Sequence, residues 1–267
     1  MMGNTKTTKW YFASDFHLGS PDYQSSRIRE AKILRWLDSI KHDATDLFLV
    51  GDTFDYWLEY KEVVPKYFIR FLGKLAQLSD AGIAIHIFVG NHDVWLFDYF
   101  KKEFNATIYY EPIVLENNGK KWYIGHGDGL GPADYGYKFI KKLFHNSVCQ
   151  ALYKWLIHPD IATRVATYLS QTSRQKNGDK DNVFHGVGEE WLVQFCVDYV
   201  QNTQHIDYFI FGHRHLCLDI TLPSASRYIN LGEWFSQCMY ASWDGKKFAF
   251  TCWEGDTQAI LKTTYDG

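Results

Sequence analysis

The sequence predicts an α/β fold in a single domain spanning all 267 residues. Short apolar runs recur along the chain, and each ends in a polar cluster, as buried strands do. Between the first runs lie segments whose apolar residues repeat with the period of an amphipathic helix. Hydrophobic residues make up 46% of the chain and charged residues 22%, which excludes disorder as the main state.

The elements follow in chain order. Five apolar runs are predicted strands, at residues 9–13, 47–50, 83–89, 122–124 and 208–211. Apolar residues at helical spacing over 28–40 and 68–78 separate the first three runs, and this alternation predicts a sheet that is covered on both faces. Near the C-terminus, 227–231 and 239–243 are predicted strands. The tight turn Asp244-Gly245 joins the latter to 247–253 as a hairpin.

The spacing between polar clusters predicts an insertion. Asp52 follows Asp15 by 37 residues, Asn91 follows Asp52 by 39, and His126 follows Asn91 by 35. Each interval fits one βαβ unit, but His213 follows His126 by 87 residues. We expect the surplus to form a helical cap at about 131–186.

Within this insertion, the apolar residues between 139 and 156 fall on one face and predict a helix. Pro159 ends that run, and Asp160 is a candidate N-cap for a second helix over 161–169. The polar segment 173–182 is expected to be a loop.

Composition excludes several classes of protein. Lys plus Arg number 28 and Asp plus Glu 31, a net charge of −3, which argues against a dedicated nucleic-acid binder. No apolar run approaches the length of a membrane span, and residues 1–9 are polar, so neither a spanning helix nor a signal peptide is expected. The five cysteines are widely spaced and form no CxxC pair, which favours reduced thiols in a cytosolic protein.

Polar side chains follow five of the predicted strands. Groups at the carboxyl ends of neighbouring strands converge on one crevice. Taken singly, each residue is also explained by a turn or a cap, but an ordered set after successive strands is not. Carboxylate, imidazole and amide ligands without thiolate suit Mn²⁺, Fe²⁺ or Zn²⁺, and the set is large enough for two ions that share a carboxylate. The residues are Asp15, His17, Asp52, Asn91, His92, His126, His213 and His215.

The order of these motifs resembles the calcineurin-like metallophosphoesterase superfamily. The motifs are Asp-x-His at 15–17, Gly-Asp at 51–52, Gly-Asn-His-Asp at 90–93, Gly-His at 125–126 and Gly-His-x-His at 212–215. The resemblance implies a two-sheet αββα sandwich, here with the helical insertion as a cap. It also implies a metal-dependent phosphoric-ester hydrolase.

The same resemblance implies a role for each motif residue. One ion would be held by Asp15, His17 and His215. The other would be held by Asn91, His126 and His213, and Asp52 would bridge the two. His92 would donate to the leaving or a non-bridging oxygen, with Asp93 orienting it. Two ions held in this way would activate a water molecule for in-line attack on phosphorus.

Further motifs are similar to those of the UDP-2,3-diacylglucosamine pyrophosphatase family of lipid A biosynthesis. They lie at 51–57, 126–129 and 230–234. This likeness implies Mn²⁺ as the ion, UMP as a product, and a location on the cytoplasmic face of the inner membrane without a spanning helix. It also implies a cap that receives acyl chains, with Trp155 and Leu156 among its lining residues. The implied substrate contacts are Asn91, His92, Asp134, Tyr137, Ser173, Asn177, Lys180 and His213.

One departure keeps alternatives open. Better-known members of that family carry Arg where this chain has His92, and a single imidazole donor replaces a forked guanidinium. A general phosphodiesterase or a phosphoprotein phosphatase is therefore the alternative enzyme. A non-catalytic scaffold is disfavoured because all seven ligand positions are filled, and the net charge disfavours a nuclease. The sequence predicts no oligomeric state.

Overall fold

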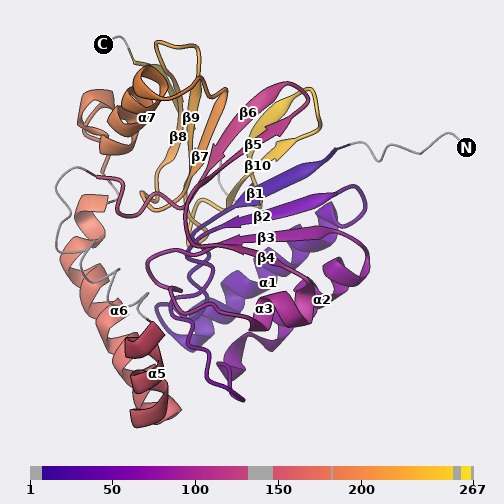
Figure 1. Ribbon diagram of the computed structural model, residues 1–267, viewed down its shortest axis with the longest axis vertical. Helices are drawn as coiled ribbons and strands as arrows, with labels where there is room; N and C mark the ends of the chain where they lie inside the picture. Colours follow the sequence, from indigo (N-terminus) through magenta and orange to yellow (C-terminus); the bar gives the residue numbers. More distant parts are fainter. Residues whose placement is uncertain (1–7, 132–146, 182, 255–259, 266–267) are drawn as a thin grey trace, which may run out of the picture.

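The computed structural model describes residues 8–131, 147–181, 183–254 and 260–265. Its strands form two sheets that face each other, as Figure 1 shows. The first sheet has the order β11-β10-β1-β2-β3-β4. Strands β1 to β4 are parallel to one another, whereas β10 runs antiparallel to both β1 and β11. The bounds are β1 Trp10–Ala13, β2 Asp46–Val50, β3 Ala84–Phe88, β4 Thr107–Tyr109, β10 Met239–Trp243 and β11 Phe248–Cys252.

The second sheet has the order β12-β8-β9-β7-β6-β5. Strands β6, β7 and β9 are parallel, and β5 and β8 run antiparallel to their neighbours β6 and β9. The bounds are β5 Ile113–Asn117, β6 Lys120–Ile124, β7 Tyr208–Phe211, β8 Cys217–Thr221, β9 Arg227–Leu231 and β12 Leu261–Thr264.

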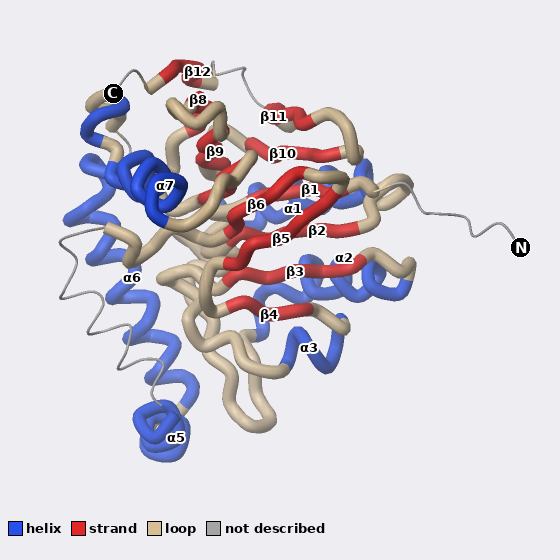
Figure 2. The backbone as a smooth tube through the Cα atoms, turned by 45° about the horizontal axis from the view of Figure 1, so that its top comes forward, coloured by secondary structure: helices blue, strands red, loops and turns tan. Residues whose placement is uncertain are grey.

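Helices cover the outer face of each sheet (Figure 2). Helices α1, α2 and α3 pack against the first sheet and α7 packs against the second. The side chain of Asp22 caps α1 by accepting hydrogen bonds from the N–H groups of Gln24 and Ser25. Within the described residues, no helix is both long and apolar enough to cross a membrane. The bounds are α1 Tyr23–Ile40, α2 Ile69–Asp80, α3 Tyr99–Phe104, α5 Ser147–Leu156, α6 Pro159–Asp181 and α7 Trp191–Asn202, with short 3₁₀ helices at Lys66–Phe68 and Val187–Glu189.

The predicted αββα sandwich is thus confirmed, and its strands explain the continuous apolar runs. In β1, Tyr11 and Ala13 face the helices whereas Trp10 and Phe12 face the other sheet. Because successive side chains of a strand point to opposite faces, a strand between a helical layer and a second sheet must be apolar at every position. Between the sheets the ring of Trp122 stacks on Phe12, with centroids 5.8 Å apart.

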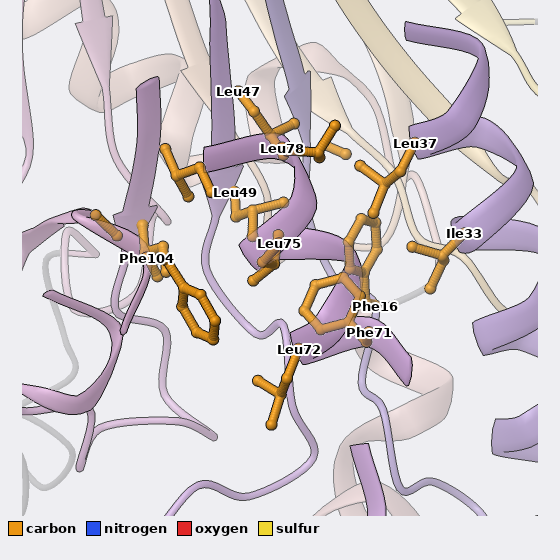
Figure 3. Close-up of a cluster of buried hydrophobic side chains, with 14 of the residues drawn as sticks. Phe16, Ile33, Leu37, Leu47, Leu49, Phe71, Leu72, Leu75, Leu78 and Phe104 are labelled. Atoms are coloured by element: carbon orange, nitrogen blue, oxygen red, sulfur yellow. The ribbon is translucent and has the colours of Figure 1, made fainter. Parts of the chain in front are cut away.

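The core between α1, α2 and the first sheet appears in Figure 3. Leu75 and Leu78 of α2 lie against Leu47 and Leu49 of β2, and all four side chains are at most 1% exposed. This core ties the outer helices to the strands whose carboxyl ends carry the predicted site.

Some expectations within the insertion are corrected. Helix α6 continues through Asp181, so the loop predicted at 173–182 is wrong over 173–181, and residue 182 lies outside the described residues. The segment 173–181 has no Pro, and its polar residues include Arg, Gln and Lys, which are good helix formers. Helix α6 already begins at Pro159, so Asp160 lies in its first turn and is not the N-cap. The break predicted at Pro159 is confirmed, because α5 ends at Leu156.

Candidate metal centre

Loops that follow five strands bring the predicted ligands to one edge of the sandwich. Backbone hydrogen bonds join these loops: the N–H of His17 donates to the carbonyl of Asp52 at 2.9 Å, and the N–H of Gly212 donates to that of His126 at 3.0 Å. The loop after β9 also joins, because the N–H of Trp234 donates to the carbonyl of Asp15 at 3.3 Å. The site therefore depends on both sheets.

The first group of predicted ligands comes from the loops after β1 and β7. Nε2 of His17 lies 3.1 Å from Nε2 of His215. Oδ1 of Asp15 lies 3.6 Å from the His17 nitrogen and 3.2 Å from the His215 nitrogen. Two ligand nitrogens at right angles about one ion, each about 2.1 Å from it, would be about 3.0 Å apart. The three atoms are therefore spaced to hold one divalent ion.

The second group gathers around Asp52. Its Oδ2 lies 3.4 Å from Nε2 of His126 and 3.6 Å from Nε2 of His17, so this carboxylate lies between the two groups. Oδ1 of Asn91 lies 3.2 Å from Nε2 of His126 and 2.9 Å from Nδ1 of His213. All seven predicted ligands thus form one continuous cluster.

The orientation of His126 is set from outside the cluster. Its Nδ1 lies 2.9 Å from the carbonyl oxygen of Val50. Because a carbonyl oxygen only accepts, Nδ1 is the donor, and Nε2 is left to face the cluster. A backbone acceptor on the far ring nitrogen is a common means of orienting a metal-binding imidazole.

Five of these ligands adopt a left-handed backbone conformation. The φ angles are 54° for Asp15, 42° for His17, 50° for Asp52, 69° for His213 and 50° for His215. A residue with a side chain pays on the order of 1 kcal/mol or more for this conformation. The left-handed conformation at these positions turns the side chains of several short loops toward one point.

Glycines directly before two ligands leave the space that other ligands occupy. A Cβ atom on Gly90 would lie 2.1 Å from Oδ1 of Asp52, and a Cβ atom on Gly212 would lie 2.4 Å from Oδ2 of Asp15. The Gly-Asn and Gly-His steps of the motifs therefore have a steric reason in this fold.

The buried charges of the first group depend on one another. Burial acts to raise the pKa of Asp15, but the neighbouring imidazoles of His17 and His215 hold it well below its usual range. Burial acts to lower the pKa of His17, but the carboxylates of Asp15 and Asp55 raise it to about 9. A proton on the imidazole of His17 thus offsets the charge of the neighbouring carboxylates in the absence of a cation.

The second group follows the same pattern. Burial acts to lower the pKa of His126, and the negative charge of Asp52 raises it to about 10. Burial and the positive charge of His126 lower the pKa of His213 to about 4. One imidazole of this group therefore carries the proton and its neighbour stays neutral.

His92 lies beside the cluster. The backbone N–H of His92 donates to Oδ1 of Asp52 at 2.9 Å. The ring of His92 lies edge-on to that of His17, with centroids 4.8 Å apart. The side chain is 14% exposed, so it borders solvent next to the candidate ligands. This position suits a residue that contacts substrate.

The resemblance implies that Asp93 orients the ring of His92, but in the structure Nδ1 of that ring lies next to Asp55. Nδ1 of His92 lies 3.1 Å from the carbonyl oxygen of Asp55 and 3.8 Å from its Oδ1. The carboxylate of Asp93 instead accepts backbone hydrogen bonds from Gly90 at 2.8 Å and Thr53 at 2.9 Å. Asp93 thus joins the loops after β2 and β3. Sequence reasoning missed Asp55, although it lies in the quoted 51–57 motif.

Arg29 of α1 is a second residue that sequence reasoning missed. It is 5% exposed, and its guanidinium donates to the carbonyl oxygens of Phe16 and His17, both at 2.7 Å. It also lies 4.2 Å from the ring centre of Phe235. An Arg within an amphipathic pattern gives no sign of burial, so only the structure shows that it fixes the loop after β1.

The predicted substrate contacts are described in part. Asn91 and His213 lie in the cluster and His92 lies beside it, as given above. Asp134 and Tyr137 lie outside the described residues. Ser173, Asn177 and Lys180 belong to helix α6, and their side chains lie outside what the structure describes.

The chain is similar to several known proteins. The chain is 39% identical over 250 residues to a UDP-2,3-diacylglucosamine hydrolase of Porphyromonas gingivalis, covering 89% of this chain and 95% of the relative. It is 28% identical over 247 residues to a protein of the same name from Hahella chejuensis, covering 89% and 94%. A solved structure of Yfce, a phosphoesterase from E. coli, is similar with 13% identity and a TM-score of 0.46, covering 95% and 97%.

A family model for calcineurin-like phosphoesterases matches residues 9–217. The matched range contains every predicted metal ligand and extends from the first strand to the end of the Gly-His-x-His motif. The chain belongs to the calcineurin-like phosphoesterase family.

Proposed function

We propose that the chain hydrolyses the pyrophosphate bond of UDP-2,3-diacylglucosamine, giving UMP and 2,3-diacylglucosamine 1-phosphate. The observation that carries the proposal is the 39% identity, over 89% of this chain, to a relative named for this substrate. Family membership makes the chain a metal-dependent phosphoesterase, and the cluster of carboxylates and imidazoles supplies the candidate ligands.

We assign Asp15, His17 and His215 to one divalent ion, and Asn91, His126 and His213 to the other, with Asp52 shared. Oδ1 of Asp15 supports the fit: it is buried and accepts no hydrogen bond within the described part of the chain. A buried anionic oxygen without a donor is costly unless a cation faces it. We propose Mn²⁺ because the resemblance to the UDP-2,3-diacylglucosamine pyrophosphatase family implies it, and a ligand set of oxygen and nitrogen atoms fits this ion.

When bound, the two ions supply positive charge that activates a water molecule and stabilises the phosphoryl oxygens. The protein's own part is positioning and proton donation. Nδ1 of His92 lies 3.1 Å from the carbonyl oxygen of Asp55, so the ring would donate to the substrate through Nε2 in its doubly protonated imidazolium form. In the reaction the water oxygen bonds to phosphorus and its proton passes to solvent, while the bridging P–O bond breaks and the leaving phosphate departs with the electron pair.

We propose that the cap at about 131–186 holds the acyl chains and the glucosamine. Two apolar residues of α5 named above are open to solvent: Trp155 is 82% exposed and Leu156 is 64% exposed. Apolar side chains that stay exposed on a helix are available to an apolar ligand. Asp134, Tyr137, Ser173, Asn177 and Lys180 remain proposed contacts to the sugar or phosphate.

We further propose that the protein works at the cytoplasmic face of the inner membrane as a peripheral protein. The substrate carries two acyl chains, so it resides in a bilayer, while its nucleotide faces water. Vesicle flotation with and without anionic lipid tests this location.

The decisive experiment measures UMP release. Purified protein with Mn²⁺ is given UDP-2,3-diacylglucosamine and, separately, bis(p-nitrophenyl) phosphate, with Asp52→Asn as the inactive control. We expect UMP from the lipid at a far higher kcat/KM than nitrophenol from the aryl ester. Hydrolysis of the aryl ester alone would support the alternative, a general phosphodiesterase or a phosphoprotein phosphatase, with which His92 in place of Arg is equally compatible. No hydrolysis of either substrate by metal-loaded protein would support a scaffold.

A further inference from the structure

Ser170 of helix α6 is buried where its neighbours are exposed. Its side chain is 7% exposed, whereas Tyr168 is 67% exposed and Leu169 is 56% exposed. Burying a small polar side chain while leaving two large apolar ones in solvent reverses the usual preference. The reason for this placement therefore lies in what the hydroxyl contacts.

The hydroxyl of Ser170 reaches the residues beside the metal cluster. Its Oγ donates to Oδ1 of Asp55 at 2.9 Å and lies 3.3 Å from Nδ1 of His92. The two other groups are also largely shielded, because Asp55 is 2% exposed and the side chain of His92 is 14% exposed. Three residues from three elements thus meet at one ring nitrogen.

The donors and acceptors at this point are determined by their partners. The carbonyl oxygen of Asp55 lies 3.1 Å from Nδ1 of His92 and can only accept, so Nδ1 carries a hydrogen. The hydroxyl of Ser170 gives its own hydrogen to the Asp55 carboxylate, which leaves its lone pairs toward Nδ1–H. The hydroxyl thus links the carboxylate and the imidazole.

Helix α6 is held against the same loops by its connection to α5. The hydroxyl of Tyr60, after β2, donates to the carbonyl oxygen of Ile157 at 3.0 Å. The ring of Trp95, after β3, lies edge-on to Tyr153 of α5 with centroids 4.4 Å apart. The α5–α6 pair therefore docks on the two loops that carry Asp52 and His92.

We propose that Ser170 is a positioning residue for His92, through which the docking of α6 sets the orientation of the imidazole at the site. The proposal rests on the proposed hydrolase function, in which His92 contacts substrate. Removing the hydroxyl leaves the metal cluster intact but releases one of the contacts that hold the ring. The variant should therefore have a lower kcat, because it still binds substrate and metals but holds the imidazole less firmly.

The test compares Ser170→Ala with Thr172→Ala. Both remove a hydroxyl from α6, but the hydroxyl of Thr172 donates to the carbonyl of Tyr168 in its own helix. With UDP-2,3-diacylglucosamine and Mn²⁺, we expect Ser170→Ala to lower kcat about tenfold, as a lost outer contact typically does, with KM changed less than twofold. Thr172→Ala should match the wild type. Manganese content and melting temperature should be the same in all three proteins.

A double-mutant cycle separates positioning from a general structural effect. In a His92→Ala background, adding Ser170→Ala should change kcat less than twofold, because there is no ring left to position. An equal tenfold loss in both backgrounds, or Ser170→Ala with wild-type kcat, would overturn the inference while the hydrolase function stands. Wild-type protein that cleaves neither the lipid nor the aryl ester would instead overturn the proposed function.

Discussion

Replacing Gly90 by Ala is the sharpest perturbation that the structure offers. The new Cβ would lie 2.1 Å from Oδ1 and 2.5 Å from the backbone nitrogen of Asp52. Ordinary contact begins at 3.4 Å, so the carboxylate or the loop must move by about 1.3 Å. Metal–ligand distances tolerate only about 0.2 Å. The shift would therefore remove the carboxylate that both ions are proposed to share.

We expect the Gly90→Ala protein to bind no Mn²⁺. Its kcat/KM should fall by at least about 10³-fold, which corresponds to about 4 kcal/mol of transition-state stabilisation. Overpacking should also lower the free energy of unfolding of the metal-free protein by about 1–3 kcal/mol. The measurements are manganese per chain after equilibrium dialysis, UMP release from the lipid substrate, and urea unfolding.

Gly73→Ala is the matched control. Gly73 lies inside α2 and a Cβ there would meet nothing within 4 Å. Alanine in a helix interior is favoured over glycine by about 1 kcal/mol, so this variant should be slightly more stable, with unchanged metal content and activity. If Gly90→Ala bound manganese like the wild type and kept its activity within threefold, the steric argument would be refuted.

Three further predictions concern separate parts of the molecule. His92→Ala should lower kcat by about 10²–10⁴-fold with manganese content unchanged; an equal loss of metal would contradict its proposed role. The pKa of His17 is raised to about 9 and that of His126 to about 10, so both imidazoles hold a proton at neutral pH. A bound cation must displace these protons. The affinity for Mn²⁺ should therefore rise with pH, about tenfold per pH unit for each proton released. Spectroscopic titrations at pH 6.5, 7.5 and 8.5 check this, and equal affinities would refute it. Leu75→Ala should cost about 2–5 kcal/mol in urea unfolding, and a cost under 1 kcal/mol would be inconsistent with its full burial.

The strands that position the site were predictable because a strand buried on both faces is apolar at nearly every position, and this pattern is visible in the sequence of the strand itself. The runs in β1, β2, β3 and β7 are apolar at nearly every position, and each is followed by polar residues, with Gly among them after β2, β3 and β7. The short or less apolar strands β4, β5, β8 and β12 carry no such signal, since their inclusion depends on pairing with strands elsewhere in the chain. Ile28 shows the same limit within a helix, because it fits the apolar repeat but is 65% exposed.

The sequence by itself determined the α/β class and the polar residues that follow five strands, among them Asp15, His17 and Asp52, because strand composition and motif residues are local properties. The αββα sandwich was implied by the family that these motifs resemble. Only the tertiary structure decided which groups surround His92. The contacts of its ring with Asp55 and Ser170 join residues 37 and 78 positions away, and Arg29 reaches the β1 loop from the middle of a helix. Such contacts depend on how helices dock on loops, and a docked polar side chain has no periodicity or composition that distinguishes it from a solvated one.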